Sequence, residues 1–456
     1  MLLLSLLIAE TFEEPLSEEE EVEPPPVGLV LAGGLLVDSE GERSADVLIV
    51  DGLIHAIGQD LEGAEVLELD GAIVTPGLID SHIHTTLMPG EWLEHEQDWD
   101  ALRAASMRAY VAAGVTTVLD AVAYPESLDE VLALEVRPEV LALGMPAALP
   151  GSYAPAVLPN WPTVTNVAEL NAHLDREAAR DVVGLKVLQE HGMVRDTWPV
   201  LEGDMADALV VGAKERGLPL YVHAMSGDET LEALELDPHA LMHTPMKPSP
   251  EAALALGASD VWVVTTMDIT ESALIEVEPA RVDEALFQLL VPEALRLATQ
   301  NPELQQASRI AMGDVALPGA PHWLTKRPVS GKILGKVAAS HQESVRLLRE
   351  SGVKLVMGSD APGWPVILNG VHGYSSIREM ELLEAIGMTP LEALDAATTR
   401  ATEMLGVQDR GRIEVGTRAD LVVHRQDPRS STSAWRELSL VVLGGEARTP
   451  AEWLAD

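Results

Sequence analysis

The sequence predicts an α/β fold, with a (β/α)8 barrel of the TIM type and a small β-sandwich built from both chain ends. Two observations predict this fold class. In the middle of the chain, short apolar runs alternate with longer amphipathic stretches, as expected for parallel strands joined by helices. At both ends, apolar runs follow one another closely and are separated by Gly and Asp, which is typical of small antiparallel strands.

The strand-rich ends form the first predicted unit. Residues 27–71 contain the runs VGLVLAGGLLV, ADVLIVDG, LIHAIG and AEVLELDG, and residues 406–448 contain GRIEVGTRADLVVHR and LSLVVLGGEAR. Neither set has enough strands to make a stable sheet alone. We therefore expect the two sets to pair into one composite β-sandwich that brackets the middle of the chain.

The middle, residues 72–405, is the predicted barrel. Its strand candidates are Ala72–Val74, Thr116–Val122, Val140–Gly144, Gly184–Val187, Leu218–His223, Ala240–His243, Val261–Thr266 and Lys354–Gly358. Amphipathic stretches such as MADALVVGAKERG lie between them, with Gly where a helix should end. Eight such units predict a closed parallel barrel, in which chemistry takes place at the C-terminal ends of the strands. The interval 268–336 is longer than one unit needs, so we expect an insertion after the seventh strand.

Residues 1–26 are predicted to be an apolar leader followed by a disordered tether. MLLLSLLIA resembles the apolar part of an export signal, but it is too short to span a bilayer and no basic side chain precedes Arg43. The next segment is rich in Glu and ends in three prolines, which favours an extended, unfolded chain. This pattern leaves an exported or envelope-associated location and a cytoplasmic one equally open.

Charge and cysteine content restrict the partners and the chemistry. The chain has 30 Lys+Arg against 73 Asp+Glu, a formal net charge of −43, so it would repel nucleic-acid phosphates. We expect no nucleic acid, no membrane-spanning segment, and a small-molecule or short-peptide substrate; a homo-oligomer is compatible with the sequence. Because the chain has no Cys, any metal ion must be held by His, carboxylate or modified Lys.

The segment TPGLIDSHIH contains the first candidate metal ligands. Pro76 and Gly77 interrupt the backbone after an apolar run, and His82 and His84 then alternate. In an extended chain, side chains two positions apart point to the same side, so both imidazoles can approach one ion. An isolated pair of this kind is weak support for a metal site, because two polar residues at a strand end are common.

Further titratable residues end other predicted strands. Lys186 lies in GLKV, His223 ends LPLYVH, His243 ends ALMH and Asp360 ends VKLVMGSD, so all of them face one rim of the barrel. Together with TPGLIDSHIH, this arrangement resembles the amidohydrolase superfamily over nearly all of residues 27–448. VHGYSSIREMELLEAIGMTPLEALDAATTRATEMLGV and GRIEVGTRADLVV are most similar to its imidazolonepropionase-like branch, which also contains Xaa-Pro dipeptidases.

The resemblance implies two divalent metal ions, best matched by zinc. Its metal ligands map onto His82, His84, a carboxylated Lys186, His223, His243 and Asp360. Carbon dioxide on the Lys186 amine would form a carbamate that bridges both ions, and a shared hydroxide would attack the substrate.

The implied activity is hydrolysis of an amide-type C–N bond in a small peptide or cyclic amide. Asp360 would be both a ligand and the catalytic group that carries a proton to the leaving nitrogen. The candidate substrate-binding residues are His372 in VHGYS, Tyr153 in LPGSYAP and His191 in QEHG.

Each residue also has a purely structural explanation. Lys186 could pair with Glu190, Asp360 could cap a helix or turn, and the histidines could be hydrogen-bonded core residues. Together, these explanations require several independent coincidences.

Two other functions differ in their expected ligands. A mononuclear deaminase of the same superfamily would normally lack the strand-four Lys and carry a Glu shortly after the strand-five His, where this chain has Ala224, Met225 and Ser226. A non-catalytic barrel that only binds a partner would be expected to have lost ligands, and this chain has all six.

Overall fold

The computed structural model describes residues 27–86, 98–157, 161–192, 198–275, 279–316, 329–363, 367 and 369–455. The predicted leader and tether, residues 1–26, lie outside the described residues. Within the described part of the chain, no helix is both long enough and apolar enough to cross a membrane.

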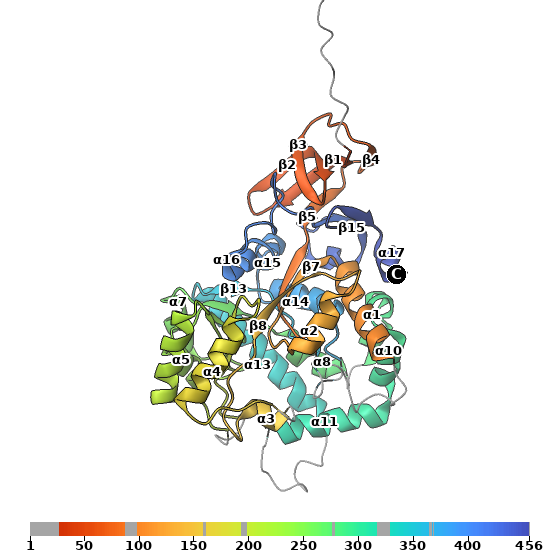
Figure 1. Ribbon diagram of the computed structural model, residues 1–456. Coiled ribbons are helices and arrows are strands. Elements are labelled where there is room, and N and C mark those ends of the chain that lie inside the picture. The colour runs from red at the N-terminus through yellow and green to blue at the C-terminus, as the bar shows by residue number, and fades with distance from the viewer. Residues whose placement is uncertain are drawn as a thin grey trace, which may run out of the picture.

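Strands from both chain ends form one eight-stranded sheet, which lies above the barrel in Figure 1. The strands run in the order β16-β15-β14-β5-β1-β2-β3, and β4 pairs with β1. Their bounds are β1 (Leu29–Asp38), β2 (Gly41–Val50), β3 (Leu53–Gly58), β4 (Glu65–Glu68), β5 (Ile73–Pro76), β14 (Leu421–His424), β15 (Leu438–Leu443) and β16 (Glu446–Arg448).

The two chain ends meet where β5 pairs antiparallel with β14, with Val74 opposite Val423. Leu31, Val74 and Leu421 belong to one buried cluster, so apolar side chains from both ends share a core. The sheet therefore depends on both termini, as expected for two strand sets that are each too small to fold alone.

The barrel is a second eight-stranded sheet in the order β13-β12-β11-β10-β9-β8-β7-β6, with every neighbouring pair parallel. A parallel bridge between Ile83 of the first strand and Ala361, in the segment that follows the last strand, brings the two edges of the barrel together. The strands are β6 (Leu78–Ile83), β7 (Val115–Asp120), β8 (Glu139–Gly144), β9 (Gly184–Leu188), β10 (Leu220–His223), β11 (Ala240–Leu241), β12 (Trp262–Val264) and β13 (Lys354–Val356). The predicted fold class is confirmed.

The first barrel strand differs from the expectation. The sequence placed it at Ala72–Val74, but Ile73–Pro76 is β5 of the end sheet, and β6 with His82 is the first barrel strand. The chain passes from one sheet to the other at Gly77, where a Cβ atom would lie 2.3 Å from Thr116 Oγ1. Only glycine allows this close approach.

Helices connect the strands and cover the barrel. Polar side chains start several of them: Asp98 caps α1 and Ser226 forms a capping box at α6. Gly217 and Gly352 follow α5 and α13 with φ values of +67° and +77°, which allows the chain to turn out of each helix. The helices that follow barrel strands, and the last one, are α1 (Trp99–Ala112), α2 (Pro125–Leu132), α3 (Tyr153–Val157), α4 (Val167–Ala178), α5 (Asp204–Glu215), α6 (Gly227–Leu234), α7 (Pro250–Gly257), α14 (Tyr374–Ala385), α15 (Pro390–Ala396), α16 (Thr399–Leu405) and α17 (Pro450–Ala455).

The connection between β12 and β13 is long and helical. Its described elements are α8 (Asp268–Ile275), η2 (Pro279–Asp283), α9 (Ala285–Leu290), α10 (Glu293–Gln300), α11 (Pro302–Ala316) and α13 (Gly331–Glu350). The short η3 (Thr432–Arg436) lies between β14 and β15. A separate insertion at residues 268–336 stays a prediction.

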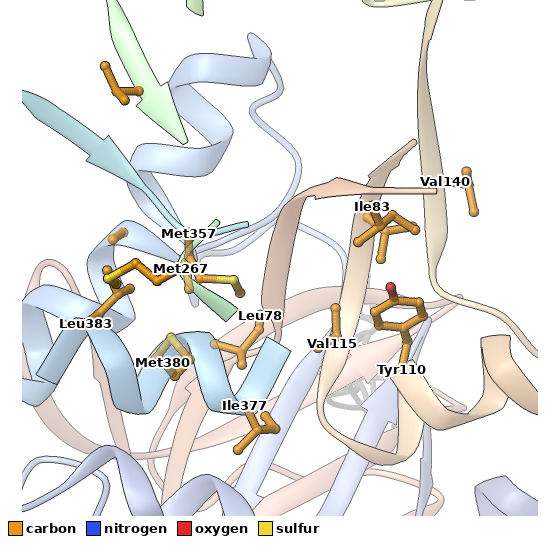
Figure 2. Packing of buried hydrophobic residues seen from close by; sticks show 14 of the residues in the cluster. Leu78, Ile83, Tyr110, Val115, Val140, Met267, Met357, Ile377, Met380 and Leu383 are labelled. Atoms are coloured by element: carbon orange, nitrogen blue, oxygen red, sulfur yellow. The ribbon is translucent and has the colours of Figure 1, made fainter. Parts of the chain in front are cut away.

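The main core lies between the strands and the surrounding helices. Figure 2 shows Leu78 and Val115 of the barrel wall near Ile377, Met380 and Leu383 of α14. All five side chains are fully buried. This apolar layer holds the strands in position and so fixes the rim at their C-terminal ends.

A smaller cluster fills the inside of the barrel. Leu185 and Val187 of β9 belong to the main core outside the barrel. Because side chains alternate along a strand, Lys186 between them points to the inside of the barrel. Tyr221 of β10 lies in the inner cluster with Met404 of α16, and its hydroxyl lies 3.4 Å from the Met404 carbonyl. This packing fills the end of the barrel next to the end sheet and leaves polar side chains at the opposite rim.

Candidate active site

His82 and His84 converge on one carboxylate oxygen. The Nε2 atoms of the two imidazoles lie 3.3 Å and 3.1 Å from Asp360 Oδ1. His82 is fully buried near the end of β6, and its Nδ1 lies 2.7 Å from the carbonyl oxygen of Met242. Burial, followed by the nearby charge of Lys186, lowers the pKa of His82. His82 is therefore held as a neutral imidazole.

Asp360 is held over the end of β6 by the backbone. Its amide donates a hydrogen bond of 2.7 Å to the His82 carbonyl oxygen, and its φ of +58° is a left-handed conformation that Asp tolerates better than most residues. Two residues earlier, a Cβ on Gly358 would lie 2.9 Å from the backbone nitrogen of His82, so this crossing requires glycine. Burial would raise the pKa of Asp360, but the positive charge that His82 carries when it is protonated, the hydrogen bond from His84 and the charges of protonated His84 and Lys186 outweigh burial and lower the pKa to about 2.

His243 and His223 extend the same cluster. The His243 ring lies 4.6 Å from the His82 ring and 4.4 Å from the His223 ring, measured between centroids. His243 Nδ1 is 3.0 Å from Thr266 Oγ1 and 3.9 Å from Asp360 Oδ2. Burial, followed by the charge of His223, lowers the pKa of His243. The imidazoles thus form a chain from β6 through β11 to β10.

Lys186 approaches this cluster from β9, where its side chain is 2% exposed. Burial lowers its pKa to about 7, although the charges of Asp360 and Asp120 act in the opposite direction. With this pKa, about half of the Lys186 amines are neutral at pH 7, and the neutral amine is the form that reacts with carbon dioxide. Within the described residues, no ion pair joins Lys186 to Glu190, which contacts His223 instead.

The donor atoms fit a divalent metal ion. His82, His243 and Asp360 each offer one ligand atom, and these atoms all lie within 4.8 Å of one another. His82 Nε2 is buried and, although it lies 3.3 Å from Asp360 Oδ1, it makes no hydrogen bond within the described part of the chain. A buried polar atom without a partner carries a free-energy cost, which coordination to a cation would remove. Neutral imidazoles and an ionised carboxylate are the ligand types that zinc prefers.

The three predicted substrate-binding residues lie in different surroundings. His372 is buried, its Nε2 lies 3.3 Å from the His84 carbonyl oxygen, and burial lowers its pKa to about 4. Tyr153 stacks on His223 with ring centroids 5.2 Å apart. His191 Nε2 lies 2.7 Å from Glu232 Oε2, and this pair is partly exposed. His372 and Tyr153 therefore contact candidate ligands, whereas the His191 side chain contacts Glu232 of α6.

Several residues around the cluster were not predicted. Asp80 is fully buried and hydrogen-bonds to Ser359, next to Asp360. Asp120 is buried at the end of β7 and accepts a hydrogen bond from the Thr85 amide. Glu190 lies 3.3 Å from His223. Asp120 could have been found in the same way as Lys186, from its position at the end of a predicted barrel strand, because it closes the run TTVLD.

The sequence profile of the Amidohydrolase family matches residues 73–447. An allantoinase of Bacillus licheniformis is 37% identical over 92 residues, which are 20% of this chain and 19% of that protein. The chain thus matches only about a fifth of this relative. An allantoinase of Deinococcus radiodurans is 25% identical over 429 residues, covering 87% of this chain and 86% of the relative.

Among solved structures, a Xaa-Pro dipeptidase with bound methionine in the active site has a similar fold. The TM-score is 0.68 at 20% sequence identity, covering 92% of this chain and 99% of the dipeptidase. At this identity the likeness concerns the fold. The family profile, which spans the barrel and strands β5, β14 and β15 of the end sheet, shows that the chain belongs to the amidohydrolase family.

Proposed function

We propose that this protein is a metal-dependent hydrolase that cleaves an amide-type C–N bond in a small peptide or cyclic amide. The observation that carries the proposal is the convergence of His82 Nε2 and His84 Nε2 on Asp360 Oδ1, at 3.3 Å and 3.1 Å. Family membership and the named relatives, an allantoinase and a Xaa-Pro dipeptidase, support C–N bond hydrolysis.

The ligand set we propose could hold two ions. It consists of His82, His84, His223, His243 and Asp360, and a carboxylated Lys186 would bridge the two ions. Two zinc ions bound there would polarise the substrate carbonyl and provide a hydroxide near neutral pH. The neutral amine that burial favours at Lys186 supports carbamate formation.

Asp360 is the proposed proton carrier. Its lowered pKa, about 2, means that the carboxylate is ionised before reaction and can accept a proton from the attacking water. Its position beside the ligand histidines lets it return this proton to the leaving nitrogen. Amide hydrolysis needs such a step, because an unprotonated nitrogen is a poor leaving group.

His372 and Tyr153 are proposed to shape the site. The contact between His372 and the His84 carbonyl supports a role in orienting His84. Tyr153 covers one face of the His223 ring and is partly buried, which supports a role in limiting water access to this ring. His191 remains a proposed substrate contact only through its position after β9.

Metal content and carbamate formation test the proposal directly. We expect two zinc ions per chain by elemental analysis, a carbamate signal on Lys186 after growth with ¹³C-bicarbonate, and hydrolysis in a screen of dipeptides, cyclic amides and lactones. A single ion with release of ammonia would indicate a deaminase. Protein that binds no metal would contradict the proposal and favour a non-catalytic barrel.

A further inference from the structure

Glu190 is a buried carboxylate beside one candidate ligand. It follows β9 four residues after Lys186, and its side chain is 2% exposed. Its Oε1 accepts a hydrogen bond of 2.9 Å from the Gly192 amide, and its Oε2 lies 3.3 Å from His223 Nε2. Each carboxylate oxygen therefore has a defined contact.

Three of the four candidate ligand histidines, His82, His243 and His223, are each held by one ring nitrogen, but the nitrogen that is held differs between them. His82 and His243 are held at Nδ1, by the Met242 carbonyl at 2.7 Å and the Thr266 hydroxyl at 3.0 Å. His223 is held at Nε2 by Glu190. If the free nitrogen of each ring faces the metal, His82 and His243 would use Nε2, whereas His223 would use Nδ1.

The Glu190 carboxylate determines which ring nitrogen of His223 carries the hydrogen. A neutral imidazole has one N–H and one lone pair, and an ionised carboxylate can only accept hydrogen bonds. Glu190 therefore favours the hydrogen on Nε2 and leaves the lone pair on Nδ1. Tyr153 stacks on the same ring with an interplanar angle of 28°, which limits ring rotation that would exchange the two nitrogens.

We propose that Glu190 is a positioning residue that fixes His223 as the Nε2-protonated tautomer and so presents Nδ1 to the metal site. The inference rests on the proposed function, because it assigns a purpose to one of the proposed ligands. Carboxylates that hold ligand histidines in this way orient the ring and make it a stronger base.

Glu190→Gln tests this proposal directly, because the Gln amide has only one acceptor oxygen and cannot replace both acceptor oxygens of the Glu190 carboxylate. The Gly192 N–H requires an acceptor, so the amide oxygen would stay there and the NH₂ group would face His223 Nε2. The NH₂ group is a donor, so it would favour the opposite tautomer, with the hydrogen on Nδ1. Glu190→Ala removes the acceptor without imposing the opposite tautomer.

The tautomer can be read by long-range ¹H–¹⁵N NMR on the full chain labelled with ¹⁵N-histidine, with the His223 signals assigned by their loss in His223→Gln. We expect the Nε2–H form in the wild type and the Nδ1–H form in Glu190→Gln. Zinc titrations against a competing chelator should show the weaker-bound ion losing roughly 10–100-fold affinity in Glu190→Gln, and less in Glu190→Ala.

Glu177→Gln is the matched control. Glu177 is a buried glutamate of α4 that accepts from the Met145 amide at 3.0 Å and pairs with Arg180, away from the candidate ligands. It should leave both the His223 tautomer and the zinc affinity unchanged. If Glu190→Gln does not fold, Glu190→Ala carries the same two measurements.

The inference is overturned if the His223 tautomer and the zinc affinity are the same in the wild type and both Glu190 variants. Unchanged values accompanied by a higher KM only for substrates with a free amine would instead make Glu190 a substrate-recognition residue, and would also overturn it. If the wild type binds no zinc, the proposed function fails, while the NMR comparison still decides the tautomer.

Discussion

Asp80 and Ser359 are joined by two hydrogen bonds across the closure of the barrel. The Ser359 amide donates to Asp80 Oδ1 at 2.9 Å, and the Ser359 hydroxyl donates to Asp80 Oδ2 at 2.6 Å. Asp80 lies two residues before His82, and Ser359 lies one residue before Asp360. This pair therefore helps to set the distance between two proposed ligands, His82 of the first strand and Asp360 after the last strand.

Ser359→Ala should weaken metal binding as well as stability. It removes a hydrogen bond to a fully buried carboxylate, which we expect to cost about 1–3 kcal/mol of unfolding free energy. Ser376→Ala is the matched control, because its hydroxyl donates to the same Asp80 Oδ2 at the same 2.6 Å but lies on α14. Urea denaturation should give similar losses for both, whereas zinc affinity should fall only in Ser359→Ala. Equal zinc affinities in the two variants would contradict this role.

Lys186→Ala should remove the bridging carbamate. We expect at most one zinc ion per chain and a fall in kcat/KM of roughly 10²-fold or more, because metal-ion charge stabilisation is worth several kcal/mol. Added acetate or propionate should restore part of the zinc content, since a carboxylate can fill the vacated space. Lys354→Ala, at an exposed residue that pairs with Asp260, should change neither quantity. Full zinc occupancy and normal turnover in Lys186→Ala would make Lys186 a structural residue.

Asp360→Asn should separate amide from ester hydrolysis. An activated ester has a leaving group that needs no protonation, so loss of the proton carrier should depress amide hydrolysis far more, by roughly 10²–10⁴-fold. Both rates should be measured at matched zinc occupancy. Equal losses on the two substrates would show that Asp360 acts only as a ligand.

Glu379 should give the protein a pH-dependent stability. It is fully buried on α14, accepts hydrogen bonds from the Thr265 hydroxyl and the Asp268 amide, and burial raises its pKa to about 8. Between its ordinary pKa and 8, the folded chain keeps this proton and the unfolded chain releases it. Unfolding free energy should therefore fall as pH rises through this window, by at most about 1.4 kcal/mol per pH unit.

Glu379→Gln isolates this contribution. Other buried groups, including Lys186, also titrate near neutral pH, so the informative quantity is the difference between wild type and variant. Urea denaturation at pH 6 and pH 8 should show a shallower decline, or a larger rise, in Glu379→Gln. The same slope in both proteins would mean that Glu379 is already ionised in the folded state.

Position at the end of a predicted barrel strand was enough to identify most residues of the candidate active site. Lys186, His223 and Asp360 could be located because each closes or interrupts an apolar run, and strand ends of a parallel barrel meet at one rim. Glu190, Thr266 and the Met242 carbonyl could not be assigned in this way. They hold ligand histidines across separations of 33, 23 and 160 positions, and only the register of neighbouring strands and loops brings them together.

The first barrel strand shows a second limit of prediction from local sequence pattern. Ile73–Pro76 and Leu78–Ile83 are adjacent and both fully buried, so nothing in their composition says which belongs to the barrel. Strand pairing assigns each segment to its sheet, because β14 pairs with the first segment and β7 pairs with the second. β7 follows soon after these segments, whereas β14 lies near the C-terminal end of the sequence, so the assignment depends on tertiary structure.

The passage from β5 to β6 also determines how the molecule can be attached to a support. The barrel strands start beside the end sheet and run away from it, and β1, the first described strand, and α17, the last described helix, lie on the end-sheet side in Figure 1. A support coupled beside β1 or α17 would therefore lie opposite the rim that carries the candidate ligands. Protein attached through this side should keep that rim open to solution.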